Sequence, residues 1–570
     1  MAMTMPARIF VPADLDPADF ARLEPLYQSL LDRPVSSAGE LEAFLRDFSE
    51  LSAVVDEYAN RRYIDKSCHT EDKAIEAAFL HFVEQISPRV KPLYFRLQKK
   101  FLESPALGQL TDIRYRMLTR QWRVDVELFR EENVAIDTEV EKAANEYGKI
   151  CGAMMVDFRG RQYTPAQMAR FSEETDRTTR QEAWEANVHR RLEDREKVDA
   201  IFEQLLPMRQ QIAANAGLAN FREYAWKANK RFDYTPADCL RFADAIAETC
   251  VPLVAKLNAQ RARELGVQTL RPWDLEVDVK GRAPLHPFAE DQVPTFVAKT
   301  REIFNRLSPA LARDFDQLGA HGNLDLDSRK GKEPGGYQCS LEESKQPFIF
   351  MNAAGLQRDV ETLLHEGGHA FHYQAAAARE PLIFLRNAPM EFCEVASMSM
   401  ELLGSEYFTV FYDEAQAARA KRKLFEGIIR FLPWMAIIDS FQHWMYTHAG
   451  HTRAQRTAQW LELLNRFTAG VDWNGYEAIR ESSWQPQRHL FHSPFYYIEY
   501  GIAQLGALQL WMRAKSDPRQ ALSNYRAALA LGGTRTLPEL FETAGIAFDF
   551  SQRTLGPLME ALREELEGLR

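Results

Sequence analysis

The chain has 570 residues, of which 46% are hydrophobic and 26% are charged; these values are ordinary for a globular protein and exclude a disordered or fibrous one. The formal net charge of −11 argues against a nucleic-acid partner, because a nucleic-acid surface normally carries a basic field. No run reaches the roughly 18 apolar residues of a membrane span, and acids interrupt the N-terminus where a signal peptide would have its apolar core.

The six cysteines are scattered without a C-x-x-C pair, so neither a thiolate zinc site nor a disulfide framework is expected. This usage is typical of a reducing compartment. We therefore expect a cytoplasmic protein with no nucleic-acid partner and no membrane partner.

The N-terminal part is predicted to be helical. From Asp14 to about Arg130, apolar residues recur at helical spacing with turn signals between them. The predicted helices cover residues 17–31, 38–58 and 71–86. No group of residues in this part has the spacing of metal ligands.

A second helical block is predicted from residue 138 to about residue 265, interrupted at residues 157–163 by a short strand or hairpin that turns at Gly160. Thr164-Pro165 and Thr235-Pro236 predict helix starts, since each Thr precedes Pro and is followed three residues on by an amide or an acid. Helices therefore dominate this block.

Residues 266–294 are rich in Pro, Asp and Gly, and this composition predicts a break between subdomains. The main strand region follows at residues 324–352, where the apolar stretch 347–351 predicts a short strand that leads into a helix. Such a strand either offers its edge to a peptide or belongs to a small structural sheet, and the sequence favours neither.

The helix after this strand contains His365, Glu366 and His369 in the order H-E-x-x-H. Residues four apart lie on one helix face, so two neutral imidazoles placed in this way can bind one Zn²⁺. The carboxylate beside them can take a proton from a metal-bound water. A random chain of this composition would contain only about 0.04 such motifs, so the pattern predicts a zinc site of the peptide-hydrolysing type.

Gly367 and Gly368 lie inside this predicted helix, where each costs about 0.8 to 1 kcal/mol relative to Ala. Two glycines beside candidate ligands predict that another group approaches the helix backbone closely. A second strand and a substrate are the two possibilities.

Three acids follow on an apolar background with helical spacing: Glu391, Glu394 and Glu401. A catalytic zinc needs a third protein ligand, and the common set is two His and one Glu. One of the three acids is therefore expected to bind the metal, and their spacing alone does not choose among them.

The stretch 484–511 concentrates aromatic and histidine residues around a loop that leads at Pro494 into a predicted helix; they are His489, His492, Tyr496, Tyr497 and Tyr500. Phenol and imidazole donors in one loop can stabilise the oxyanion that forms when water attacks a peptide carbonyl. The alternative is an aromatic core that contains two incidental histidines.

Together these motifs resemble the zinc oligopeptidases of the thimet oligopeptidase and oligoendopeptidase F family, and are most similar to its Pz-peptidase-like members. His365 to His369 matches the family's H-E-x-G-H, and Glu394 lies 29 residues after His365, where the family places its third ligand. Residues 271–274, 329–337 and 347–350 are similar in order and spacing to family segments. The resemblance covers roughly residues 200–510, and the first 150 residues carry no matching motif.

The resemblance implies a mainly α fold: a large two-lobed helical body with a small β-sheet beside the zinc helix and a deep central channel for short peptides. It implies two parts, an N-terminal helical region at residues 1–150 and a catalytic metallopeptidase region at residues 151–570. It also selects Glu394 over Glu391, so that His365, His369 and Glu394 hold one Zn²⁺ per chain.

The function that the resemblance implies is endopeptidase action on short oligopeptides, with Glu366 as general base. His489, Tyr497 and Tyr500 are the expected oxyanion donors, and Glu391 and Glu401 could orient the histidine ligands. Two alternatives remain, an exopeptidase of the dipeptidyl carboxypeptidase kind with the same zinc site, and a peptide-binding protein without activity. The sequence predicts no oligomeric state.

Overall fold

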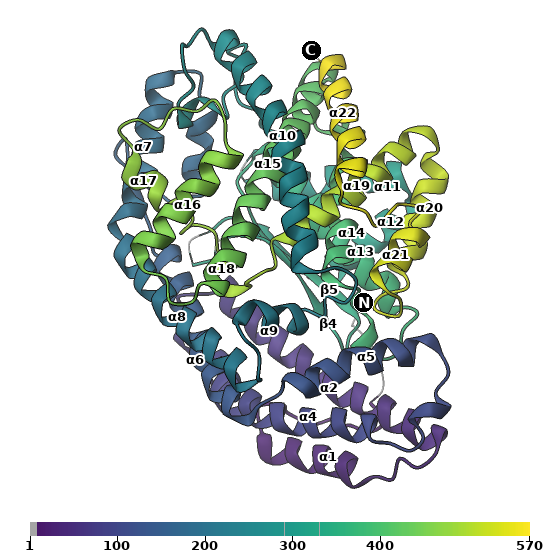
Figure 1. Cartoon of the computed structure of the whole chain (residues 1–570). Coiled ribbons are helices and arrows are strands. Elements are labelled where there is room, and N and C mark those ends of the chain that lie inside the picture. Colours follow the sequence, from purple (N-terminus) through teal and green to yellow (C-terminus); the bar gives the residue numbers. More distant parts are fainter. Residues whose placement is uncertain (1–7, 290, 330, 334, 570) are drawn as a thin grey trace.

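The N-terminal helices lie together at one end of the molecule (Figure 1). The computed structural model describes residues 8–569 except residues 290, 330 and 334. The first part forms α1 (Phe20–Asp32), α2 (Ala38–Cys68), α3 (Lys73–His81), α4 (Ser87–Leu102) and α5 (Ile113–Leu128). The predicted helices are therefore present, but α2 continues past residue 58.

The additional turns of α2 reach a β-sheet that is formed by residues 324–353. The side-chain amide of Asn60 donates to the Ser340 carbonyl oxygen at 2.8 Å, and the hydroxyl of Ser67 bonds with that of Tyr337. Residues 59–68 look too polar for a helix with a buried face, and these long-range bonds explain why the helix extends over them. Leu382 and Leu385, which follow the helix of the H-E-x-x-H motif, join the N-terminal hydrophobic core.

The middle of the chain forms α6 (Glu131–Gly152), the hairpin strands β1 (Val156–Phe158) and β2 (Arg161–Tyr163), α7 (Arg177–Glu193), α8 (Arg195–Asn215), α9 (Phe221–Ala228) and α10 (Pro236–Leu265). The predicted hairpin is confirmed, with Gly160 at φ 78°. The helix start at Thr235 is confirmed by a capping box. At Thr164 the Thr and Gln side chains also cap a helix start, but the helix that follows, Gln167–Glu173, is a 3₁₀ helix and not an α-helix.

The predicted boundary at residue 150 falls in the last turn of α6, and the division of the chain into two parts there stays a prediction. The described residues between α10 and residue 293 include a 3₁₀ turn at Pro272–Asp274 within irregular backbone. α11 (Val293–Leu307) and α12 (Pro309–Ala320) follow and lead into the second sheet.

The second sheet consists of β3 (Leu324–Asp327), β4 (Tyr337–Leu341) and β5 (Gln346–Ala353), in the order β3-β5-β4. β5 is parallel to β3 and antiparallel to β4, so both of its edges are paired. The strand before the helix of the H-E-x-x-H motif therefore has no free edge for a peptide, and β3 and β4 lie at the two edges of the sheet.

The rest of the chain is helical, and α14 packs between α13 and α19. Its elements are α13 (Gln357–Ala377), α14 (Met390–Ser405), α15 (Glu414–Thr447), α16 (Arg453–Phe467), α17 (Glu477–Glu481), α18 (His489–His492), α19 (Ile498–Ser516), α20 (Pro518–Leu529), α21 (Leu537–Thr543) and α22 (Gln552–Gly568). The mainly α class and the small sheet beside α13 are confirmed. None of the described helices is long and apolar enough to cross a membrane.

Candidate active site

The two histidines of the H-E-x-x-H motif meet Glu394 where α13 and α14 pack together. Glu394 Oε2 lies 3.4 Å from His365 Nε2 and 3.5 Å from His369 Nε2. Two donors bound at about 2.1 Å to a tetrahedral zinc lie about 3.4 Å apart. The three side chains therefore have the chemistry and the spacing to surround one ion, and the structure brings together all three predicted ligands.

The glycines of the motif allow α14 to lie against α13. A Cβ on Gly368 would lie 2.5 Å from the Ala396 carbonyl oxygen and 2.6 Å from Ser397 Cα. A Cβ on Gly367 would lie 2.7 Å from Cζ of Phe304 in α11. The predicted close approach is confirmed, but the neighbours are a helix backbone and an aromatic ring rather than a strand or a substrate.

Other side chains hold the candidate ligands in place. Glu401 Oε1 lies 2.6 Å from His365 Nδ1, which leaves Nε2 free to face a metal. Glu394 accepts two hydrogen bonds, from the Ser397 hydroxyl at 2.9 Å and from the Tyr496 hydroxyl at 2.5 Å. The contact of Glu401 was predicted, but the contacts of Ser397 and Tyr496 were not, since no spacing rule links Tyr496 to Glu394.

Glu391 has other partners than the two histidines. It accepts a hydrogen bond from the Tyr234 hydroxyl, and its Oε1 lies 3.8 Å from Arg231 Nε. Glu391 and Arg231 are separated by 160 positions in the sequence, so this contact could not be predicted from spacing. The expectation that Glu391 orients a histidine ligand is therefore wrong.

Glu366 is buried, with 6% of its surface exposed, and its Oε2 has no hydrogen-bond partner among the described residues. Burial raises the pKa of this carboxyl above its ordinary value, although the two motif histidines partly oppose the shift. For Glu394, burial acts in the same direction, but His369 and His365 outweigh it and hold the pKa well below the ordinary value. The two carboxylates are thus suited to different tasks, one to accept a proton and one to stay ionised.

His489 lies among the tyrosines that the sequence singled out. Its ring centroid is 5.7 Å from that of Tyr496, 5.1 Å from that of Tyr497 and 5.7 Å from that of Tyr500. Its Nε2 lies 3.4 Å from the Tyr500 hydroxyl, and the Gln487 amide donates to its Nδ1 at 2.7 Å. Burial and the charge of the adjacent arginine lower the pKa of His489 to about 4, so the imidazole is neutral at pH 7.

The other histidine of this segment points elsewhere. His492 faces α6, where its ring lies 5.9 Å from that of Tyr147. α19 begins at Ile498 and not at Pro494, because Phe495 adopts a left-handed conformation with φ 66°. The predicted start of this helix was wrong for that reason.

A second group with potential ligand atoms, Cys239, Asp439 and His443, lies in the core between α10 and α15. His443 Nε2 and Asp439 Oδ2 are 3.2 Å apart. Both side chains lie on α15, four residues apart, so they share one face of that helix. No spacing rule links these residues, since Cys239 lies 200 positions before Asp439.

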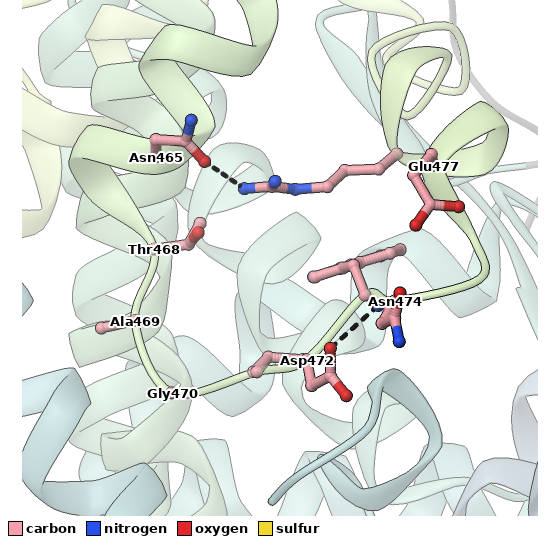
Figure 2. A pocket seen from close by; sticks show the side chains of 10 residues that line it. Asn465, Thr468, Ala469, Gly470, Asp472, Asn474 and Glu477 are labelled. Carbon is pink, nitrogen blue, oxygen red and sulfur yellow. Dashed lines mark hydrogen bonds between the residues drawn. The ribbon is translucent and has the colours of Figure 1, made fainter.

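A pocket of about 420 Å³ lies apart from these residues, between the end of α16 and α17 (Figure 2). Among its lining residues, the Arg480 guanidinium donates a hydrogen bond of 2.7 Å to Asn465 Oδ1. None of the candidate site residues lines this pocket, so it does not correspond to the predicted substrate channel. That channel stays a prediction.

Comparison with known proteins agrees with the geometry. The sequence profile described as peptidase family M3 matches residues 170–558, and that of the peptidase M3 N-terminal domain matches residues 10–129. The chain belongs to peptidase family M3. The predicted family is thereby confirmed, and the match extends to the N-terminal region, in which we found no family motif.

Solved structures resemble this peptidase over nearly its whole length. An oligoendopeptidase F and Pz peptidase A with an inhibitor each superpose with a TM-score of 0.92 at 27% identity, covering 98% of this chain and 99% of the other. Oligopeptidase PepF of Bacillus subtilis (strain 168) is 24% identical over 230 residues, or 39% of this chain. The alignment covers 33% of the length of that relative.

Proposed function

We propose that this M3 peptidase is a zinc-dependent endopeptidase that hydrolyses internal peptide bonds of short oligopeptides. The observation that carries the proposal is the position of Glu394 Oε2, 3.4 and 3.5 Å from the Nε2 atoms of the two motif histidines. The names of its relatives, which include oligoendopeptidase F and oligopeptidase, support peptide substrates and internal cleavage.

His365, His369 and Glu394 would hold one zinc ion per chain. When bound, zinc supplies Lewis-acid chemistry: it polarises a peptide carbonyl and makes a water acidic enough to be a nucleophile near neutral pH. Two imidazoles and one carboxylate leave a further position open, as in other catalytic zinc sites. Glu401 would keep Nε2 of His365 directed at the ion through its bond to Nδ1.

Glu366 would act as the general base. Its Oε2 is buried and without a hydrogen-bond partner among the described residues, so it can receive the proton of the attacking water. The raised pKa of the carboxyl brings its basicity closer to neutral pH, where such a base is most effective. The same oxygen would then deliver the proton to the leaving amine.

His489, Tyr500 and Tyr497 would assist at the carbonyl oxygen. Burial and the charges of Glu394 and Glu366 raise the pKa of Tyr500 well above its ordinary value, so its hydroxyl keeps its proton and can donate it in a hydrogen bond. The neutral His489 contacts this hydroxyl, and the ring of Tyr497 packs against both side chains. Each strong donor to a developing oxyanion lowers the barrier by about 2.7 to 4 kcal/mol.

The decisive experiment uses an internally quenched peptide of about ten residues with both ends blocked. We expect cleavage at an internal bond, loss of activity with a chelator and recovery with zinc. Glu366→Gln should keep its zinc, because Glu366 is not a proposed ligand, and should lose about 10²- to 10⁴-fold in kcat. Metal analysis of both proteins provides the control.

Other outcomes would contradict the proposal. Cleavage of free-ended peptides only would indicate an exopeptidase, and stoichiometric zinc without any cleavage would indicate a peptide-binding protein. A Glu366→Gln variant with full activity would exclude the general-base role.

A further inference from the structure

The backbone around Phe495 is held by side chains from remote parts of the chain. Phe495 is completely buried and has φ 66°, a left-handed conformation that is unfavourable for a residue with a large side chain. It immediately precedes Tyr496, whose hydroxyl donates to Glu394. A strained residue persists only where its surroundings enforce it, so the contacts of this peptide unit matter.

Gln442 of α15 holds the amide side of Phe495. Gln442 Oε1 accepts the hydrogen bond of the Phe495 backbone N–H at 2.5 Å. Gln442 Nε2 donates to the carbonyl oxygen of Ile438 at 3.3 Å, which fixes the orientation of the amide group. Gln442 is fully buried, so water cannot take its place.

Arg231, in the connection between α9 and α10, holds the carbonyl side. Its Nη2 donates to the Phe495 carbonyl oxygen and to Glu499 Oε1, the latter at 2.8 Å. Its Nε lies 3.8 Å from Glu391 of α14, the helix that carries Glu394. One buried guanidinium therefore connects the strained peptide, the first turn of α19 and the helix of the third candidate ligand.

We propose that Gln442 and Arg231 are positioning residues of the active site. They hold Phe495 in the left-handed conformation, and thereby place the Tyr496 hydroxyl on Glu394 and the Tyr500 hydroxyl beside His489. The proposal rests on the proposed function for its effect on catalysis. Its effect on metal binding follows from the Tyr496–Glu394 contact and can be measured without any substrate.

The test is a double-mutant cycle of Gln442→Met and Tyr496→Phe, with metal affinity measured by competition against a chelator. Met has a similar length but no strong acceptor for the Phe495 N–H. We expect each single variant to lower metal affinity about tenfold, as loss of a ligand's hydrogen-bond partner does. The double variant should bind metal about as well as either single one, because Gln442 acts through Tyr496.

A matched control separates positioning from stability. Gln98 of α4 is also buried, and it donates to Asp125 at 3.0 Å in the N-terminal part. Gln98→Met should lower the unfolding midpoint and leave metal affinity and kcat of the folded protein unchanged. Gln442→Met should lower kcat at least tenfold with a smaller change in KM, and Gln442→Glu, which keeps an acceptor, should recover part of it.

The proposal is overturned if folded Gln442→Met binds metal as the wild type does, or if the two substitutions have fully multiplicative effects on metal affinity. If Gln442→Met does not fold, Arg231→Lys replaces it in the same cycle, with the same expected and contradicting results. If the double-mutant cycle shows the expected coupling in metal affinity but the endopeptidase assay shows no cleavage, only the proposed function is contradicted.

Discussion

The two halves of the candidate site are built in different ways. On α13 and α14, the metal ligands lie on regular helices, and two of them are separated by one turn of the same helix. In the segment from Gln487 to Tyr500, the backbone turns through α18 and a left-handed residue before α19 begins. The first half is ordered by its own helical hydrogen bonds, whereas the second depends on side chains from elsewhere.

Arg209 of α8 shows this dependence most plainly. It is 2% exposed and donates to the backbone carbonyl oxygens of Leu490 and Phe491, and also to the Tyr446 hydroxyl at 2.7 Å. Removal of such a donor leaves buried carbonyl groups without hydrogen-bond partners, which lowers the free energy of unfolding. The comparison teaches that the ligands lie on regular helices, which local sequence specifies, whereas the backbone of the tyrosine half is held by residues far away in the chain.

Tyr500→Phe is expected to have the largest effect on kcat among the substitutions that distinguish the two halves of the site. If the tyrosine segment supplies oxyanion donors, loss of this hydroxyl should lower kcat about 10²- to 10³-fold and leave metal content unchanged, because Tyr500 does not contact a ligand. Steady-state kinetics with metal analysis provides the measurement. Loss of metal from this variant would show that the halves are not separate.

Tyr497→Phe is the matched comparison for that prediction. Burial raises the pKa of Tyr497 to about 12, with Trp434 and Arg358 as its polar surroundings, whereas Glu394 and Glu366 influence Tyr500. We therefore expect Tyr497→Phe to cost less than about tenfold in kcat. Equal losses in the two variants would mean that Tyr497 contributes as much as Tyr500 to stabilisation of the oxyanion.

The same comparison explains which parts of the site the sequence could predict. His365, Glu366 and His369 follow from helical periodicity, and most helices follow from apolar spacing and capping residues. Glu394 needed the family resemblance, because Glu391 and Glu401 share its helix and its apolar context. Only the packing of α13 against α14 distinguishes the three acids.

The rest depends on contacts between residues far apart in the chain. Tyr496 and Glu394 are separated by 102 positions, and Arg231 and Glu499 by 268. No periodicity or local propensity encodes such pairs, so the start of α19 and the partner of Glu391 were both predicted wrongly. The extension of α2 past residue 58 was missed for the same reason, since its polar residues bond to β4.

The ligand half should be sensitive to a single methyl group at Gly368. The Cβ of Gly368→Ala would overlap the backbone of α14, which cannot move aside as a flexible side chain can. We expect a loss of about 1 to 3 kcal/mol in stability and weaker metal binding, because the two helices that carry the ligands must separate. Chelator competition and the unfolding midpoint measure both effects.

Gly427→Ala is the control, since this exposed helical glycine in α15 has nothing within 4 Å of an added Cβ. It should raise stability by about 0.5 to 1 kcal/mol and leave metal binding unchanged. A Gly368→Ala variant that binds metal like the wild type would refute the close packing of α13 on α14.

The smallest expected effect concerns the pH dependence of stability that arises from His492, which lies in the segment from Gln487 to Tyr500. Burial, together with Arg488 and Arg209, lowers the pKa of His492 to about 3. An unfolded chain has a histidine pKa near 6.5, so it binds a proton more readily than the folded protein at acidic pH. The stability linked to neutral His492 is therefore complete above about pH 6.5 and is lost progressively as the pH falls toward 3.

At pH 5.5, one unit below the unfolded value, this loss amounts to about 1.4 kcal/mol. His492→Gln removes the titrating group, so the fall in unfolding midpoint between pH 7.5 and pH 5.5 should be smaller in the variant than in the wild type. His448→Gln, at an exposed position, is the control for loss of an imidazole. If His492→Gln and the wild type lose the same stability over this interval, burial and the charges of Arg488 and Arg209 do not disfavour protonation of His492.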